Sequence, residues 1–196
     1  MPIAPPTGHV QAIETEYAGC RFRSRLEARW AVVFDQLDIN WQYEPEGLDI
    51  NGVRYLPDFY LPSVGAYAEV KGRMDPRGME KVFALARARP SVLVLGDIPR
   101  PDVMGPHFIM ASARRGGPLQ GWQVSLLQSW DGPFVAMPFG FPIDIPDPAS
   151  LDDLKAWCDF INDGLTSING WIRTPQRVAD AYTAGRSARF EFGEMG

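Results

Sequence analysis

Three short stretches of the chain carry carboxylates and a lysine in a pattern that suits phosphodiester chemistry. Asp58 follows Pro57, and after ten intervening residues come Glu69, Val70 and Lys71. Side chains of an extended strand alternate between its two faces, so Glu69 and Lys71 point the same way, roughly 7 Å apart. A carboxylate and an amine that project together make a poor core, so this pattern predicts a site.

Hydrolysis of a phosphodiester needs oxygen ligands for a divalent cation, a nucleophilic water and stabilisation of the departing oxygen. Magnesium is bound through one or two carboxylates together with waters and phosphate oxygens. We therefore expect Asp58, Glu69 and the backbone carbonyl of Val70 to hold Mg²⁺, for which Mn²⁺ is expected to substitute. Lys71 is expected beside the attacking water and the scissile phosphate, as orienter, electrostatic stabiliser or base.

A helix precedes this pattern and brings a further acidic residue. Ser24 is a predicted N-cap for a helix over residues 25–38, with Glu27 at the third position as in a capping box. An apolar stripe at helical spacing comprises Leu26, Trp30, Val33, Phe34 and Leu37. Glu27 lies at the edge of that stripe, so its role is either that of a site carboxylate or only that of a helix cap.

The pattern itself lies in predicted strands over residues 41–50, 53–61 and 66–70 or 71. Asn51-Gly52 is typical of a tight hairpin, and Pro57 predicts a bulge or break in the second strand. A second helix is expected from Pro76, with Asp75 as N-cap, to about Arg89. Residues 91–95 follow as a strand buried on both faces. This order of helix, three strands, helix and strand (α-β-β-β-α-β) predicts the α/β class.

The composition changes beyond residue 96. Nine of the 18 prolines and six glycines fall in residues 97–148. That density predicts an irregular extension with short strands only at residues 108–111, 122–127 and 134–137. Helices are expected over residues 151–163 and 175–188. For 196 residues we expect one domain, with its core in residues 1–96 and residues 97–196 completing it.

The string from Pro57-Asp58 to Glu69-Val70-Lys71 resembles the signature of the PD-(D/E)XK nuclease superfamily, which has the restriction-endonuclease-like fold. The helix that carries Glu27 is similar to the first helix of the branch containing archaeal Holliday-junction resolvases, the TnsA transposition endonuclease and RecB-type nucleases. The resemblance covers about residues 17–95. It implies a central mixed sheet flanked by helices, and Glu27, Asp58 and Glu69 around the metals. The glutamine and tyrosine motif of RecB-type members is not evident on the second helix.

The function implied is that of a magnesium-dependent deoxyribonuclease, more specifically an endonuclease of DNA recombination, repair or mobile-element processing, as in a phage. A restriction or defence endonuclease and a TnsA-like transposition endonuclease are alternatives that use the same site. A DNA-binding module that keeps the fold without cutting is a third. A homodimer is plausible because many members of the superfamily cut as dimers.

Charge and composition bear on the partners. The formal charge of −5 divides into −1 for residues 1–90 and −4 for the remainder. Six basic residues beside the predicted site are expected to contact DNA phosphates: Arg21, Arg23, Arg25, Arg73, Arg77 and Lys81. The two cysteines, the absence of an apolar membrane segment and the N-terminal residues predict a protein of a reducing cytoplasm, and the resemblance implies that this is a bacterial or phage-infected host cytoplasm. No phosphate-binding glycine loop is present, so no nucleotide cofactor is expected.

Each of these residues also has an ordinary structural interpretation. Asp58 next to a proline is compatible with a simple turn residue, and Glu69 with Lys71 is compatible with a solvated ion pair of little energetic weight. The basic residues are compatible with a charged surface. Only their placement in three dimensions distinguishes these interpretations from a site.

Overall fold

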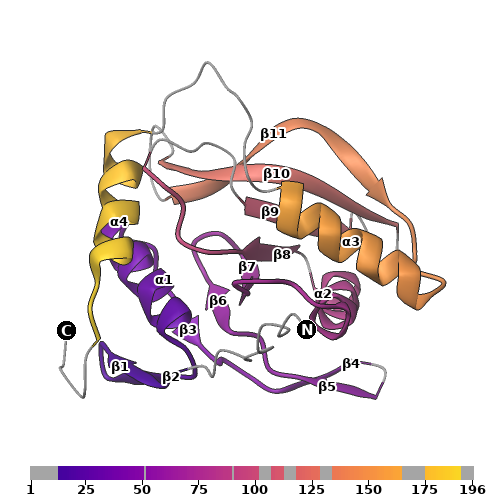
Figure 1. Ribbon diagram of the computed structural model, residues 1–196, viewed down its shortest axis with the longest axis horizontal. Helices are drawn as coiled ribbons and strands as arrows, with labels where there is room; N and C mark the ends of the chain where they lie inside the picture. Colours follow the sequence, from indigo (N-terminus) through magenta and orange to yellow (C-terminus); the bar gives the residue numbers. More distant parts are fainter. Residues whose placement is uncertain are drawn as a thin grey trace, which may run out of the picture.

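The fold is built on one mixed β-sheet with helices on both faces (Figure 1). The computed structural model describes residues 13–50, 52–89, 91–101, 107–112, 118–128, 134–164 and 175–190. Within these residues the sheet has seven strands in the order β11-β10-β9-β8-β7-β6-β3. Their bounds are β3 Gln42–Tyr43, β6 Phe59–Leu61, β7 Ala66–Val70, β8 Ser91–Leu95, β9 His107–Ser112, β10 Leu119–Gln128 and β11 Phe134–Ile145.

The strand that bears the predicted site lies in the middle of this sheet. Strand β7 pairs antiparallel with β6 and parallel with β8, and the other neighbours in the sheet are antiparallel. A parallel pair needs a crossover connection, which here is helix α2 (Pro76–Ala88). All five residues of β7 are buried. The residues at the carboxyl end of β7 therefore have a paired strand on each side.

Two helices cover each face of the sheet. Helix α1 (Arg25–Gln36) and helix α4 (Gln176–Ser187) lie on one face, whereas α2 and helix α3 (Leu151–Gly164) lie on the other (Figure 1). Ala68 and Val70 of β7 belong to the hydrophobic cluster beneath α1, and Tyr67 belongs to the cluster beneath α2. The alternation of side chains along β7 thus divides the core into two halves.

The two helices of the first face approach each other closely at Gly185 of α4. A Cβ atom there would lie 2.5 Å from Val33 Cγ2 and 3.1 Å from the carbonyl oxygen of Arg29. Glycine removes this clash and lets α4 settle against α1. The position of α1, which carries Glu27, is therefore fixed from behind by the C-terminal part of the chain.

Two small hairpins complete the fold. The first pairs β1 (Thr15–Tyr17) with β2 (Cys20–Phe22) and leads directly into α1. The second pairs β4 (Leu48–Ile50) with β5 (Val53–Tyr55). Gly52 in its turn has φ +84°, which favours glycine. The hairpin predicted from Asn51-Gly52 is confirmed by the Ile50 to Val53 pairing, although Asn51 itself lies outside the described residues.

The α/β class and the predicted helices are confirmed, but two strand predictions need correction. The segments expected as one strand each, over residues 41–50 and 53–61, both form two short strands that belong to two different sheets. The expected break at Pro57 is confirmed, because residues 56–58 separate β5 from β6. The β1-β2 hairpin was not predicted.

The three strands expected at residues 108–111, 122–127 and 134–137 are present, but the prediction that they are short and lie in an otherwise irregular segment is wrong for the described residues. Strands β9, β10 and β11 have 6, 10 and 12 residues and extend the sheet beyond β8. Proline and glycine are accommodated within these strands instead of ending them. No helix in the part of the chain that the structure describes has the length and apolar character needed to cross a membrane.

Candidate functional site

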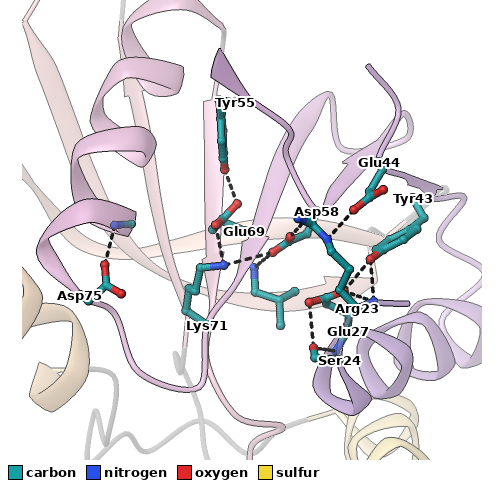
Figure 2. Close-up of polar contacts among 12 residues, drawn as sticks. Arg23, Ser24, Glu27, Tyr43, Glu44, Tyr55, Asp58, Glu69, Lys71 and Asp75 are labelled. Carbon is teal, nitrogen blue, oxygen red and sulfur yellow. Dashed lines mark hydrogen bonds and ion pairs between the residues drawn. The ribbon is translucent and has the colours of Figure 1, made fainter. Parts of the chain in front are cut away.

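The predicted site residues meet at the carboxyl end of β7 (Figure 2). Glu69 is the fourth residue of that strand, and Lys71 directly follows it. Asp58 comes from the segment between β5 and β6, and Glu27 comes from the first turn of α1. Three segments far apart in the sequence therefore supply the side chains of one cluster.

Asp58 is held by the backbone of the central strand. Its Oδ2 atom accepts a hydrogen bond of 2.8 Å from the Val70 amide, and only 3% of the residue is exposed. Pro57 interrupts the β5 to β6 stretch, so Asp58 is free of ladder pairing and its side chain lies beside β7. The turn interpretation of this residue is thus inadequate, since its carboxylate is buried among ionic groups.

Glu69 is equally buried and has two partners. Its Oε2 atom accepts a hydrogen bond from the Tyr55 hydroxyl, and its Oε1 atom lies 2.9 Å from the Lys71 ammonium. The residue is 2% exposed. Glu69 and Lys71 therefore do not form a solvated surface pair, because the glutamate is buried.

Lys71 connects the two carboxylates. Its Nζ atom lies 4.0 Å from Asp58 Oδ2 in addition to its contact with Glu69, and its backbone amide donates to the Leu95 carbonyl at 2.8 Å. Burial by itself lowers the pKa of this amine, but Glu69 and Asp58 outweigh that effect and raise the pKa of Lys71 above its ordinary value. The side chain is 36% exposed, so the ammonium is reachable from solvent.

The cluster carries more negative than positive charge. Burial and the neighbouring Glu69 raise the pKa of Asp58 to about 7, while Lys71 and the Val70 amide oppose that rise. Burial disfavours the ionised form of Asp58, and the adjacent Glu69 carboxylate disfavours it further, so a positive charge at this place would stabilise the ionised form. The site therefore favours an additional cation.

Glu27 is confirmed as the capping-box glutamate of α1. Its amide donates to Ser24 Oγ at 3.2 Å, and its Oε1 atom accepts from the Ser24 hydroxyl at 2.8 Å. Its Oε2 atom accepts from the Tyr43 hydroxyl at 2.7 Å and from the Arg23 amide at 3.1 Å. Both carboxylate oxygens are thus used to join α1 to β2 and β3, yet the charge is near enough to affect the pKa of Asp58 and Lys71.

Arg23 and Glu44 extend the cluster on the side of α1. Arg23 Nε lies 2.5 Å from Glu44 Oε1, and its Nη2 atom lies 3.5 Å from Asp58 Oδ1. Glu44 has φ +44°, a left-handed conformation that is costly for a residue with a side chain. Its amide donates to the Asp58 carbonyl at 2.9 Å, which holds this conformation.

The other basic residues predicted to contact DNA are distributed more widely. Arg21 forms an exposed ion pair with Glu14, and Arg25 is partly buried at the start of α1. Arg73 and Arg77 are exposed before and in the first turn of α2. Lys81 lies nearer, because its Nζ atom is 5.8 Å from the centre of the Tyr55 ring.

The donor set fits a hard divalent cation that keeps part of its water shell. Asp58 and Glu69 supply two buried carboxylates, which matches the one or two that magnesium takes from a protein. In the described part of the chain, no three or more His, Cys, Asp and Glu side chains stand close enough to form a metal cage. The Lys71 ammonium occupies the position between the two carboxylates.

Three residues of this cluster were not predicted from the sequence: Tyr43, Glu44 and Tyr55. Tyr55 is buried, and a buried tyrosine needs a hydrogen-bond partner for its hydroxyl. Its position three residues before Asp58 is the sequence feature that points to such a partner in the site. Glu44 carried none, since its conformation depends on its pairing with Asp58. Comparison of the chain with protein-family models, with curated proteins and with solved structures gives no match.

Proposed function

We propose that this protein is a metal-dependent DNA nuclease with a restriction-endonuclease-like fold, which hydrolyses phosphodiester bonds as an endonuclease. The observation that carries the proposal is the convergence of Asp58, Glu69 and Lys71 at the carboxyl end of β7 (Figure 2). These are the three residues of the PD-(D/E)XK signature, and they come from segments whose meeting the sequence spacing alone does not require.

Asp58 and Glu69 are the residues that would hold Mg²⁺ or Mn²⁺, with the carbonyl of Val70 as a further oxygen ligand. Bound there, such an ion polarises the phosphate and lowers the pKa of a water molecule. Burial and, after it, the neighbouring Glu69 raise the pKa of Asp58, and a cation at this place would offset both effects. The Tyr55 hydroxyl and the Val70 amide each hold one oxygen of these carboxylates and so orient both side chains toward the ion.

Lys71 is the residue that we assign to the phosphate. Its ammonium is held by Glu69 and Asp58 and keeps about a third of its side chain exposed. Its raised pKa keeps it protonated at neutral pH, so it acts as a hydrogen-bond donor and charge stabiliser toward a phosphate oxygen. In this form it orients the attacking water and does not remove a proton from it.

Glu27 is better assigned to positioning than to direct metal binding. Its two oxygens accept hydrogen bonds from Ser24, Tyr43 and the Arg23 amide. These hydrogen bonds join α1 to β2 and β3 and use both oxygens of the carboxylate. Its charge adds to the negative field on Asp58.

The direct test presents a panel of DNA forms to the purified protein with magnesium. Linear duplex, supercoiled plasmid, single strand, flap and four-way junction are incubated with the wild type, Lys71→Ala and Lys155→Ala. Lys155 is a matched control because it forms an exposed ion pair with Asp152 on α3. We expect wild type and Lys155→Ala to cut at least one form and Lys71→Ala to cut none.

Two outcomes contradict the proposal in different ways. Equal cutting by Lys71→Ala and the wild type would indicate a contaminating nuclease or another site. Tight DNA binding by all three proteins without cutting, with either magnesium or manganese, would favour a non-catalytic module of the same fold. The preferred DNA form narrows the substrate class, and sensitivity of cutting to base methylation distinguishes a restriction enzyme.

A further inference from the structure

Arg23 is placed between two carboxylates at the edge of the cluster. Its Nε atom contacts Glu44 and its Nη2 atom faces Asp58 Oδ1, as Figure 2 shows. These two contacts differ in length, 2.5 Å to Glu44 against 3.5 Å to Asp58. The guanidinium therefore forms a close ion pair through Nε with Glu44 and a long hydrogen bond through Nη2 with Asp58. Its side chain is 54% exposed, so it is open to a ligand.

Glu44 is itself tied to Asp58. The Glu44 amide donates to the backbone carbonyl of Asp58, and this bond keeps Glu44 in its left-handed conformation. Residues in unfavourable backbone conformations persist where the surrounding structure requires them. Here the requirement is met by Asp58, so the backbone of a metal-binding residue determines where Glu44 and hence Arg23 lie.

The balance of charge makes the Asp58 contact dependent on a cation. Glu27, Glu44, Asp58 and Glu69 face two cations, Arg23 and Lys71, which leaves a formal charge of −2 when all are ionised. One divalent ion neutralises this charge. With such an ion at Asp58, the attraction between that carboxylate and Nη2 is weakened, whereas the contact between Nε and Glu44 is unaffected.

We propose that Arg23 is a phosphate-binding residue of this site and that Glu44 is its positioning residue. In the structure, Nη2 faces Asp58 Oδ1 at 3.5 Å. When a divalent cation binds, Nη2 turns from Asp58 to a backbone phosphate of the DNA while Glu44 keeps its hold on Nε. This inference rests on the proposed nuclease function, and it adds that metal binding and phosphate binding are coupled through one arginine.

The test measures how DNA affinity depends on salt, with and without a divalent ion. A fluorescent linear duplex is titrated with the wild type, Arg23→Gln and Arg87→Gln in either Ca²⁺ or EDTA. Arg87 is the matched control because it also pairs with a carboxylate, Asp147, but lies in the last turn of α2, away from β7's carboxyl end. Ca²⁺ takes the same oxygen ligands as magnesium.

We expect Arg23→Gln to make one phosphate contact fewer than the wild type when the cation is present, and the same number when it is absent. In Ca²⁺ the plot of log affinity against log salt becomes shallower by about 0.9 for Arg23→Gln, the value for one phosphate. In EDTA the slopes of Arg23→Gln and wild type agree. Arg87→Gln matches the wild type in both conditions.

Kinetics with magnesium separate a phosphate contact from a structural role. Arg23→Gln is expected to raise KM roughly tenfold with kcat little changed, as for one lost charge-assisted hydrogen bond. Arg23→Lys keeps the charge and recovers the salt slope, although it loses the anchored fork geometry. Glu44→Gln is expected to raise KM about threefold without changing the salt slope, because the arginine charge remains but is less well oriented.

The failures of this inference and of the proposed function differ. Wild type that neither binds nor cuts DNA with any divalent ion overturns both. Wild type that cuts DNA, with an Arg23→Gln salt slope equal to its own in Ca²⁺, overturns only the role of Arg23. A slope that is shallower by the same amount in Ca²⁺ and in EDTA contradicts the coupling to the metal.

Discussion

The Tyr55 hydroxyl donates a hydrogen bond to Glu69 Oε2, although Tyr55 lies in the small β4-β5 hairpin and Glu69 in the central strand of the large sheet. This bond joins the two sheets at the site. It leaves Glu69 Oε1 for Lys71. The hairpin, which is otherwise peripheral, thereby fixes the orientation of a proposed metal ligand.

We expect Tyr55→Phe to weaken metal binding and to lower the free energy of unfolding. Hydrogen bonds that orient metal ligands typically change metal affinity or activity by about 10- to 100-fold when removed. The magnesium concentration for half-maximal cleavage should rise within that range, and the free energy of unfolding should fall by about 2 kcal/mol for a lost bond to a buried charge. Cleavage rates over a magnesium titration, together with urea unfolding, measure both.

Tyr60→Phe is the matched control for this change. Tyr60 is a partly buried tyrosine of β6 whose ring packs at a tilt against the Tyr67 ring, and its hydroxyl has no hydrogen bond to another described residue. Its magnesium dependence should equal that of the wild type. Equal magnesium dependence in Tyr55→Phe and Tyr60→Phe would contradict a role for the Tyr55 hydroxyl in placing Glu69.

Lys71→Ala should separate metal affinity from catalysis. The ammonium lies between the two carboxylates that would hold the ion, so its removal leaves more negative charge for a cation. We expect Mn²⁺ to bind roughly tenfold more tightly by calorimetry, since an unopposed charge at this distance is worth more than 1 kcal/mol. Cleavage should fall by roughly 10²- to 10⁴-fold.

Lys155→Ala controls for loss of a surface ammonium and should change neither quantity. The expected combination of tighter metal binding with lost cleavage is not produced by unfolding, which lowers both. Weaker Mn²⁺ binding by folded Lys71→Ala would show that the lysine supports the metal site instead of competing with it.

The parts of this structure that were predictable from the sequence are those that local rules determine. Ser24 caps α1 and Asp75 caps α2, each through a side-chain oxygen that accepts an amide hydrogen bond. Pro57 breaks its strand because it cannot join a ladder. These residues act within a few positions of themselves, so the sequence neighbourhood was sufficient to predict them.

The strands beyond residue 96 were not predictable in this way, because the proline and glycine residues within them are explained by tertiary structure and not by local turns. Pro138 lies in β11, which is the edge strand of the sheet among the described residues, and edge strands are where sheets tolerate proline. Gly121 lies in β10, where a Cβ atom would come within 2.2 Å of the Phe108 ring. A count of prolines and glycines predicts irregular structure at both positions, whereas both residues lie within paired strands.

Within the site, the carboxylates and the lysine were predictable but their neighbours were not. The spacing of Asp58, Glu69 and Lys71 is a sequence pattern, and the structure brings these three together. The contact of Arg23 with Glu44 depends on the backbone of Glu44 and on the β1-β2 hairpin that leads into α1. Such long-range placements have no signature in the local sequence.

Glu27→Gln tests whether Glu27 acts through position or through metal binding. Since both of its oxygens accept hydrogen bonds within the cap and from Tyr43, the change should lower the free energy of unfolding by about 1 to 2 kcal/mol. Ser24→Ala removes the same cap and is the matched variant. We expect the two proteins to cut DNA at similar rates when assayed well below their melting temperatures. A loss of cutting confined to Glu27→Gln, with the fold intact, would place Glu27 among the metal ligands.

The final prediction concerns acid stability and a buried histidine remote from the cluster. His107 of β9 lies 2.8 Å, through Nε2, from the Tyr182 hydroxyl of α4, and Nδ1 has no partner among the described residues. Burial lowers the pKa of His107 from 6.5 to about 3. The folded protein therefore keeps this imidazole neutral over a range in which the unfolded chain protonates it.

The sign of the effect follows from that difference in protonation. Between about pH 6.5 and pH 3 the unfolded state binds the extra proton, so the free energy of unfolding falls with pH by up to about 1.4 kcal/mol per unit from this group. Asp58 acts in the opposite direction between 3.8 and about 7, because its raised pKa makes the folded state the stronger proton binder. Urea unfolding of wild type and His107→Gln at pH 7, 6, 5 and 4 isolates the histidine contribution, since Asp58 is common to both. We expect the free energy of unfolding of His107→Gln to rise relative to that of the wild type as the pH falls. A difference that stays constant would show that His107 is protonated in the folded state as well.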